Sequence, residues 1–343
     1  MIEHVSGNLL EADAEALVNT VNTVGIMGKG IALQFRQAYP ENYEAYRKAC
    51  EQEEVQPGRM FVFHTGQLGN PKHIVNFPTK RHWKGKSKMV DIEAGLTALV
   101  KWVRAERIRS IALPPLGCGN GGLNWEDVRP RIEEAFAAVP ETRVLLYAPE
   151  GAPAAEAMPV ATKTPNMTAG RAALIGLLSD YAVPGYRLTL LEVQKLAYFL
   201  QAAGEPLRLA FVKERYGPYA ETLHHVLQRL DGHFIRGYGD RSRDASIRLL
   251  PHAREDADQF LDQHPATRQR LQRVSELIDG FESPYGMELL ATVHWVAQES
   301  DEARSDSSAA VRGVHAWSDH KKRTFRPEHI QVAWQRLHEQ EWL

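Results

Sequence analysis

The chain has 343 residues, of which 43% are hydrophobic and 24% are charged, and its formal net charge is −2. This composition is typical of globular proteins, and at roughly 100–200 residues per domain the length predicts two domains. The net charge is too close to zero to indicate any partner.

Four observations argue against a secreted, membrane or metal-binding protein. The N-terminus lacks a basic region followed by an apolar run, and no apolar stretch approaches the roughly 20 residues that span a bilayer. Cys50 and Cys118 are the only cysteines, too few for a disulfide framework or a zinc site, and the 14 histidines lack metal-ligand spacing. We therefore expect a cytoplasmic protein with no membrane partner, metal or cofactor. The pair His224-His225 is expected to be solvated on an amphipathic helix.

Residues 1–150 alternate strand-like and helix-like segments, which predicts an α/β domain with helices covering a mixed sheet. Short apolar runs predict strands at Ile2–Ser6, Ala16–Val21, Met60–His64, His73–Phe77, Ile108–Pro114 and Val144–Tyr147. Helical patterns lie between them at Gly30–Ala38, Glu41–Glu53, Val90–Arg107 and Trp125–Ala138.

The composition then changes. Residues 151–167 are rich in Ala and Pro and predict a linker. Residues 168–343 predict a second, mainly α-helical domain, with Thr168 and Thr189 as helix N-caps. The predicted helices are Ala169–Tyr181, Leu190–Ala202, Tyr219–Leu230, Pro265–Asp279, Tyr285–Gln298 and Pro327–Gln340.

Two glycine-rich segments each follow a predicted strand and precede a helix. In Val18–Ala32, residues Gly28–Ile31 are suited to phosphate groups, because glycines permit close approach and a helix N-terminus offers free N–H groups. Asn19 and Asn22 carry amides suited to ribose hydroxyls.

The second segment, Pro114–Trp125, has four glycines within six residues. The first segment contains Gly25–Gly30, GIMGKG, which lacks the glycine spacing of a GxGxxG dinucleotide fingerprint. It is not a Walker A loop either, because Lys29-Gly30 is not followed by Ser or Thr. Paired loops at strand ends favour a ligand site there.

These segments resemble those of macrodomains. The match runs through Gly7–Leu10, Asn19–Asn22, Gly28–Ala32 and Pro115–Leu123, and the chain looks most similar to the bacterial DarG antitoxins. The resemblance implies a mixed central sheet flanked by helices that binds ADP-ribose, with Asn8 and Leu9 near the adenine and Gly117–Gly121 around the phosphates. The implied ADP-ribose-binding residues are Asn8, Leu9, Thr20, Val21, Asn22, Gly28, Lys29, Gly30, Ile31, Thr79, Gly117, Cys118, Gly119, Asn120 and Gly121.

The resemblance also implies that Lys80, which follows Asn76-Phe77-Pro78-Thr79, is catalytic, while Asn22 orients the distal ribose. A neutral lysine amine can attack C1″ of the ribose and form a Schiff base that water releases. A cationic lysine can instead stabilise the departing anion, and the residues alone leave both roles open. Related terminal ADP-ribose enzymes carry an acid where this chain has Gly121, so a strict lysine–aspartate mechanism is in doubt.

Residues 79–88 contain five Lys or Arg, no acid and one tryptophan. Basic groups follow a phosphate backbone and an aromatic face stacks on a base, so Arg81, Trp83 and Lys84 are candidate DNA-binding residues. The resemblance implies ADP-ribosylated thymine in single-stranded DNA as the substrate, ADP-ribose as the product and a DarT toxin as the partner. The alternative is that the loop only keeps the surface soluble and that its tryptophan packs into the core of the protein.

The C-terminal half carries two further signals. Residues 189–200, with Arg215–Tyr219, resemble the Panacea-type helical domains of antitoxins, which implies direct toxin binding. Residues 276–306 hold eight acids against Arg304 alone, so an acidic face could imitate DNA phosphates, or could simply be a solvated helix face. Two other functions stay open: a non-catalytic ADP-ribose reader joined to a protein-binding domain, and a glycohydrolase acting on ADP-ribosylated protein.

Overall fold

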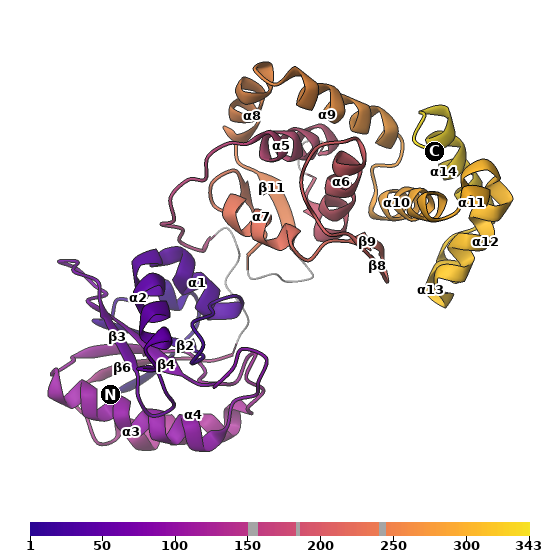
Figure 1. Cartoon of the computed structure of the whole chain (residues 1–343). Helices are drawn as coiled ribbons and strands as arrows, with labels where there is room; N and C mark the ends of the chain where they lie inside the picture. Colours follow the sequence, from indigo (N-terminus) through magenta and orange to yellow (C-terminus); the bar gives the residue numbers. More distant parts are fainter. Residues whose placement is uncertain (150–156, 183–185, 240–244) are drawn as a thin grey trace. The chain divides into compact units, whose positions relative to one another are not determined.

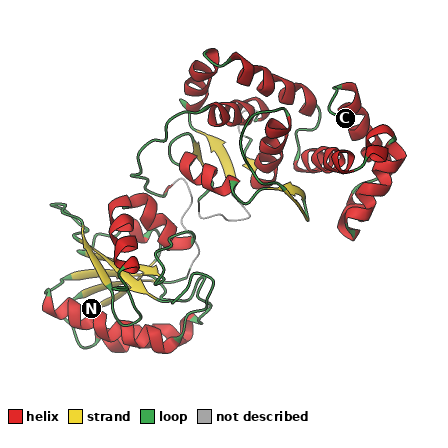
Figure 2. Cartoon of the chain, in the orientation of Figure 1, coloured by secondary structure: helices red, strands yellow, loops and turns green. Residues whose placement is uncertain are grey.

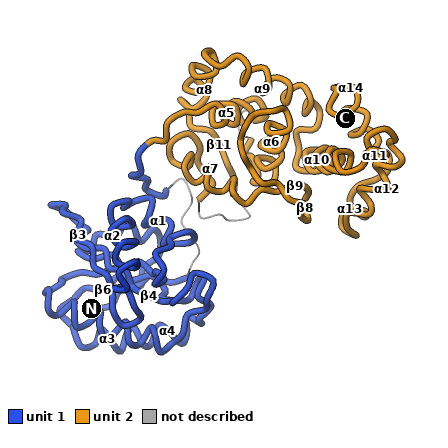
Figure 3. The backbone as a smooth tube through the Cα atoms, viewed as in Figure 1, with its two compact units in different colours: residues 1–163 blue, residues 164–343 orange. Residues whose placement is uncertain are grey.

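The computed structural model describes residues 1–149, 157–182, 186–239 and 245–343. The chain divides into two compact units, Met1–Lys163 and Thr164–Leu343 (Figure 3). Of the predicted linker at 151–167, residues 151–156 lie outside the described residues. Residues 157–163 belong to unit 1, where Met158 is buried and the Ala161 N–H donates to the Gln37 carbonyl at 2.9 Å. These seven residues therefore pack on unit 1, and the predicted linker bounds of 151 and 167 stay a prediction.

Unit 1 is built on a six-stranded sheet (Figure 1). The strands are β1 (Ile2–Val5), β2 (Ala16–Val21), β3 (Phe61–His64), β4 (His73–Pro78), β5 (Ser110–Leu113) and β6 (Arg143–Tyr147). Their order is β1-β6-β5-β2-β4-β3, and all neighbouring pairs are parallel except β3 with β4. The carboxyl ends of five strands therefore meet at one edge of the sheet.

Helices cover both faces of this sheet. They are a short 3-10 helix η1 (Leu9–Glu11) and α1 (Gly30–Ala38), α2 (Pro40–Glu51), α3 (Met89–Ala105) and α4 (Trp125–Phe136). Successive strand residues point to opposite faces, so Val18 joins the core under α3 and α4, whereas Leu17 joins the core with Phe35 of α1. Burial on both faces explains why the strands are short continuous apolar runs. The predicted α/β fold class with a mixed sheet is confirmed.

Unit 2 is rich in helices (Figure 2). Its helices are α5 (Ala169–Tyr181), α6 (Leu190–Ala202), α7 (Leu223–Leu230), α8 (Ala253–Asp262), α9 (Pro265–Ile278), α10 (Pro284–Glu299), α11 (Asp301–Ser305), α12 (Ser307–Trp317), α13 (Asp319–Thr324) and α14 (Pro327–Glu339). Its strands are β7 (Leu188–Thr189), β8 (Val212–Glu214), β9 (Gly217–Tyr219), β10 (Ile235–Arg236) and β11 (Ser246–Leu249). The predicted N-caps are confirmed, since the side chains of Thr168 and Thr189 accept first-turn N–H groups.

Two expectations for unit 2 are wrong. The helix predicted at Tyr219–Leu230 begins at Leu223, because Gly217–Tyr219 pair as strand β9 with β8. His224 is not solvated: it is buried, and its two ring nitrogens contact the hydroxyls of Tyr219 and Tyr238. Its neighbour His225 is exposed, as expected.

No helix in the described residues is long and apolar enough to cross a membrane. Across the same residues, no group of three or more His, Cys, Asp or Glu side chains is arranged to hold a metal ion.

Candidate active site

Three loops leave the carboxyl ends of adjacent parallel strands in unit 1 and meet at one edge of the sheet (Figure 1). Residues 22–29 follow β2, residues 79–88 follow β4 and residues 114–124 follow β5. Strand order alone makes these loops neighbours, because β2 pairs with both β4 and β5. This edge is the usual position for ligands of open α/β sheets.

The loop after β5 folds back on itself. The N–H of Leu123 donates to the Gly117 carbonyl and the N–H of Gly122 donates to the Gly119 carbonyl, both at 3.1 Å. Among the described residues, the N–H groups of Gly119, Asn120 and Gly121 have no hydrogen-bond acceptor. Consecutive free N–H groups in a tight loop form a concavity that binds anions. The loop therefore suits the diphosphate of ADP-ribose.

The loop after β2 lies against the same concavity. A Cβ on Gly30, which has a φ of +57°, would come within 3.1 Å of the Asn120 side-chain nitrogen. Within the described chain, the first turn of α1 receives no side-chain cap from Lys29, so its N–H groups stay free for a ligand. Gly28 and Ile31 are half-buried beside it. Gly28–Ile31 and Gly117–Gly121 are thus brought together, as the sequence predicted.

Lys80 is the first residue beyond the strand end and its adjoining Thr79. The Thr79 N–H continues the sheet by donating to the Val21 carbonyl at 2.9 Å, which fixes the start of the loop. The Lys80 Nζ donates to the backbone carbonyl of Asn120, so the amine lies at the glycine-rich loop. Partial burial lowers the pKa of Lys80, since desolvation disfavours the charged form. The lowered pKa increases the share of neutral amine at a given pH.

Asn22 and Asn19 are used inside the fold. The Asn22 side chain is buried, accepts the N–H groups of Val24 and Ile26, and donates to the Ile26 carbonyl. Asn22 thus shapes the β2–α1 loop, and its predicted role at the distal ribose stays a prediction. The expectation that Asn19 contacts ribose is wrong. Asn19 is fully buried and donates to Asn76 at 3.1 Å, because strand alternation turns it under α2.

The implied adenine residues lie after β1 at the same edge of the sheet. Asn8 caps η1 by accepting the Leu10 N–H at 3.1 Å, and its amide donates to Glu11 and to the Ala157 carbonyl, each at 3.1 Å. Leu9 is buried, as is Val21, whereas Thr20 is half-buried. Their contacts with adenine or ribose stay predictions.

Gly121 cannot be replaced by an acid without moving the loop. A Cβ there would lie 2.2 Å from the Gly117 carbonyl oxygen and 2.3 Å from Ser87 Oγ. The chain therefore has no space for the carboxylate that related enzymes carry at this position. The neighbouring Cys118 thiol is also a poor nucleophile, since burial raises its pKa to about 11. Lys80 is left as the reactive group in contact with this loop.

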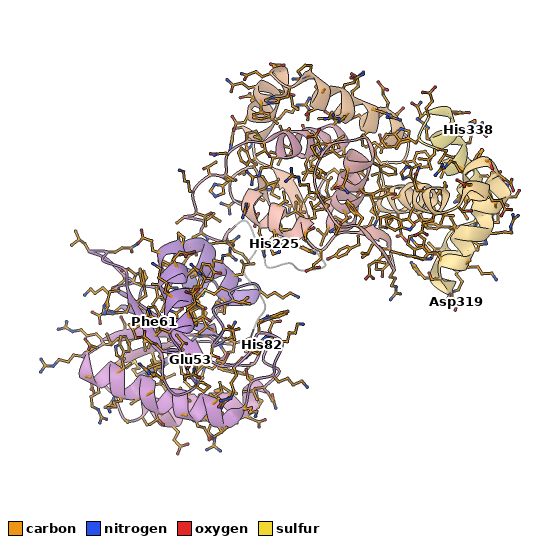
Figure 4. All side chains as sticks on the ribbon, in the orientation of Figure 1. Glu53, Phe61, His82, His225, Asp319 and His338 are labelled. Carbon is orange, nitrogen blue, oxygen red and sulfur yellow. The ribbon has the colours of Figure 1, made fainter. Side chains whose placement is uncertain are left out.

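The basic loop after Lys80 is largely exposed. Trp83 is 49% exposed and Lys84 Nζ lies 4.9 Å from the centre of its ring, so the tryptophan does not pack in the core. His82, labelled in Figure 4 on the outside of unit 1, packs in a tilted arrangement against the same indole, with 5.4 Å between the two ring centres. Arg81 instead forms an ion pair with Asp91 of α3 at 2.7 Å. Trp83, Lys84 and Arg81 are thus all accessible to a polymer, although Arg81 also ties the loop to α3.

Three residues at the site escaped sequence reasoning. Tyr46 is fully buried and its hydroxyl donates to the Asn22 carbonyl at 2.6 Å. Asp91 holds Arg81, and the buried Ser87 reaches the glycine-rich loop through its N–H, which donates to the Gly121 carbonyl at 3.0 Å. Tyr46 and Asp91 lie outside the motifs, so no sequence signal marks them. Ser87 lies within the basic segment 79–88, where the lysines and the tryptophan carry the signal and a serine does not stand out.

The fold and these loops define a macrodomain, and a family model described as Macro domain matches residues 18–132. A relative from Thermus aquaticus, named DNA ADP-ribosyl glycohydrolase, is 51% identical over 97% of this chain and 92% of its own length. The chain therefore belongs to the DNA ADP-ribosyl glycohydrolase family, the DarG family, which confirms the resemblance drawn from its motifs.

Two further matches add context. The solved macrodomain of Mycobacterium tuberculosis DarG is 57% identical, covers 44% of this chain and 99% of its own, and gives a TM-score of 0.43. A fusion protein of Thermosipho africanus, named DNA ADP-ribosyl transferase-DNA ADP-ribosyl glycohydrolase, is 35% identical over 42% of this chain and 41% of its own length.

Proposed function

We propose that the protein releases ADP-ribose from ADP-ribosylated thymidine bases of single-stranded DNA. Membership of the DNA ADP-ribosyl glycohydrolase family gives the reaction class. The observation that carries the proposal is the hydrogen bond from Lys80 to the Asn120 carbonyl, because it holds an amine of lowered pKa at the loop suited to the diphosphate. A module that only reads ADP-ribose has no use for such a group.

In this mechanism the neutral Lys80 amine attacks C1″ of the distal ribose. The bond between C1″ and the base nitrogen breaks, its electron pair stays on that nitrogen, and the nitrogen takes up the proton that the lysine amine loses on bonding to C1″. Water then adds to C1″ of the lysine adduct, and the lysine departs as an amine with ADP-ribose as the product. If Lys80 stays cationic, it stabilises the departing base anion instead, and water attacks C1″ directly.

The DNA strand is proposed to cross the exposed face of Trp83. An indole stacks on any base, and the adjoining Lys84 ammonium can neutralise a phosphate. Arg81 pairs with Asp91 through Nη2, and its side chain is 60% exposed, so it can add positive charge to the same path. This assignment explains an exposed tryptophan in a basic loop without requiring base-specific contacts.

Trp83→Ala is expected to lower kcat/KM on ADP-ribosylated single-stranded DNA by about 5- to 150-fold, because one base–aromatic stack is worth roughly 1–3 kcal/mol. Affinity for free ADP-ribose should stay unchanged, as calorimetry would show. Leu68→Ala is a control, since Leu68 is a fully exposed apolar residue in the β3–β4 connection, at the opposite end of β4 from Lys80. Equal rates for the two variants would remove Trp83 from the DNA path.

We also propose that residues 168–343 bind a DarT-type toxin directly. A relative that joins a DNA ADP-ribosyl transferase to a glycohydrolase supports a functional pairing of the two activities. Not all of the acids in the stretch 276–306 are exposed and free of ion pairs. Glu288 is buried against Lys321, and Glu302 pairs with Arg312 at 2.6 Å. The exposed acids suited to imitate phosphates include Glu299 and Asp301, of which Asp301 lies 3.6 Å from Arg304.

The full chain carrying Lys80→Ala, which is unable to remove ADP-ribose, should still inhibit DNA modification by the toxin in proportion to its concentration. Reversing Glu299 and Asp301 to Lys should weaken that inhibition and reduce its salt dependence, since exposed charges act over about 8 Å at physiological ionic strength. Reversing Glu53 and Glu54, exposed acids of unit 1, is the matched control. A folded Lys80→Ala chain that leaves the toxin fully active would refute direct binding.

A further inference from the structure

Ser87 closes the loop that begins at Lys80, and its side chain ends inside the glycine-rich loop after β5. The residue is 7% exposed, and a Cβ on Gly117 would lie 3.1 Å from its Oγ, while a Cβ on Gly121 would lie 2.3 Å from it. The hydroxyl therefore occupies the space that side chains at 117 and 121 would need. Ser87 is one of several reasons for glycine here, since Gly117 also has a φ of +73° and a Cβ on Gly121 would also meet the Gly117 carbonyl.

The Ser87 hydroxyl lacks a partner. Its Oγ is buried and makes no hydrogen bond to any described residue, although the Ser87 N–H donates to the Gly121 carbonyl at 3.0 Å. A buried hydroxyl without a partner is destabilising, and such groups are uncommon in folded proteins. The free N–H groups of Gly119, Asn120 and Gly121 lie in the same loop. Four unused donors around one concavity match a ligand rich in acceptors.

We propose that Ser87 is an ADP-ribose-binding residue whose hydroxyl donates to the diphosphate held by residues 119–121. This inference rests on the proposed function, since it assumes that ADP-ribose occupies the loop. In the absence of a carboxylate at position 121, the polar side chain at the centre of the loop comes from the Lys80 loop. One loop then supplies both the reactive amine and a phosphate ligand, so the diphosphate and Lys80 are positioned together.

The test compares Ser87→Ala with the unchanged chain in calorimetric titrations with ADP-ribose and in competition titrations with adenosine, which has no phosphate. Loss of a hydrogen bond to a charged group predicts a fall in ADP-ribose affinity of about tenfold or more, with adenosine affinity unchanged. Ser87→Cys, which keeps the packing against the two glycines but is a weaker donor, should give an intermediate affinity. This variant keeps the test decisive if Ser87→Ala fails to fold.

Unchanged ADP-ribose affinity in folded Ser87→Ala would overturn the assignment, and so would an equal loss for ADP-ribose and adenosine, which would indicate a purely structural role. Failure of the unchanged chain to bind ADP-ribose would instead contradict the proposed function, so the two failures are distinguishable.

Discussion

Lys80→Ala is expected to lower the rate of ADP-ribose release from modified DNA about a thousandfold or more, while changing the affinity for ADP-ribose less than about threefold. The reason is geometric. Lys80 contacts the glycine-rich loop through a hydrogen bond to the Asn120 carbonyl, whereas the proposed diphosphate donors are backbone N–H groups that the substitution leaves in place. Single-turnover release measures the first quantity and calorimetry measures the second.

A matched pair of substitutions at Gly119 tests ADP-ribose binding separately from catalysis. Gly119→Glu should abolish ADP-ribose binding by placing a carboxylate among the phosphate donors. Gly119→Ala should retain binding, because no described atom lies within 4 Å of a Cβ at that position. Near-normal release of ADP-ribose by Lys80→Ala would contradict a catalytic role for the lysine.

The variant Lys80→Arg separates the two roles of the lysine. A guanidinium keeps the positive charge but is not neutral at any accessible pH, so it can stabilise an anion and cannot attack C1″. Burial lowers the pKa of Lys80, so a nucleophilic lysine predicts a rate that rises with pH and levels off below the ordinary lysine value of 10.5. A rate that falls as the amine loses its proton would identify the cationic role.

The second large effect concerns the stability of unit 2. Glu288→Ala is expected to reduce the free energy of unfolding by about 3–5 kcal/mol, as in other buried ion pairs that lose one partner. Lys321 is fully buried, and its Nζ donates to Glu288 at 2.6 Å and to Thr292 at 3.0 Å. Removing the carboxylate leaves an ammonium with one remaining acceptor, and urea unfolding of the full chain would measure the loss.

Replacing both partners, Glu288→Leu with Lys321→Met, should recover most of that stability, since an apolar pair of similar volume needs no desolvation of charge. The pH dependence of Glu288→Ala supplies a further check. Desolvation already lowers the pKa of Lys321, so the unfolded state binds the proton more tightly than the folded state. The loss of unfolding free energy in Glu288→Ala should therefore become smaller as the pH rises toward the ordinary pKa of lysine. Surface substitutions usually change the free energy of unfolding by less than about 0.5 kcal/mol. A loss no larger than that in Glu288→Ala would show that the ion pair does not stabilise the fold.

The sequence predicted the parts of the site that depend on local patterns. Glycine spacing and strand ends placed Gly28–Ile31 and Gly117–Gly121 at the same edge of the sheet. The sequence indicated Lys80, which follows the Asn-Phe-Pro-Thr strand end, only through its resemblance to a known family. It did not predict Ser87, because a serine eight residues into a basic loop signals nothing until the loop closes back on Gly121. Asn19 was misplaced for the converse reason: it lies in a glycine-rich motif, yet strand alternation buries it against Asn76.

Unit 2 shows the same limit for secondary structure. Its long apolar helices follow the sequence pattern, and Ala169–Tyr181 and Leu190–Ala202 were predicted with their observed bounds. Its strands span two to four residues, too short for period-two alternation to register, and the buried contacts of His224 with Tyr219 and Tyr238 depend on the positions of those strands.

The most direct test of the proposed activity is the release of ADP-ribose from a single-stranded oligonucleotide with one ADP-ribosylated thymidine, alongside an ADP-ribosylated protein at the same concentration. The unchanged chain should release ADP-ribose from the oligonucleotide with a much higher kcat/KM, and Lys80→Ala should release almost none. Faster release from the protein, or no release from the oligonucleotide by a chain that binds ADP-ribose, would contradict a DNA-directed glycohydrolase.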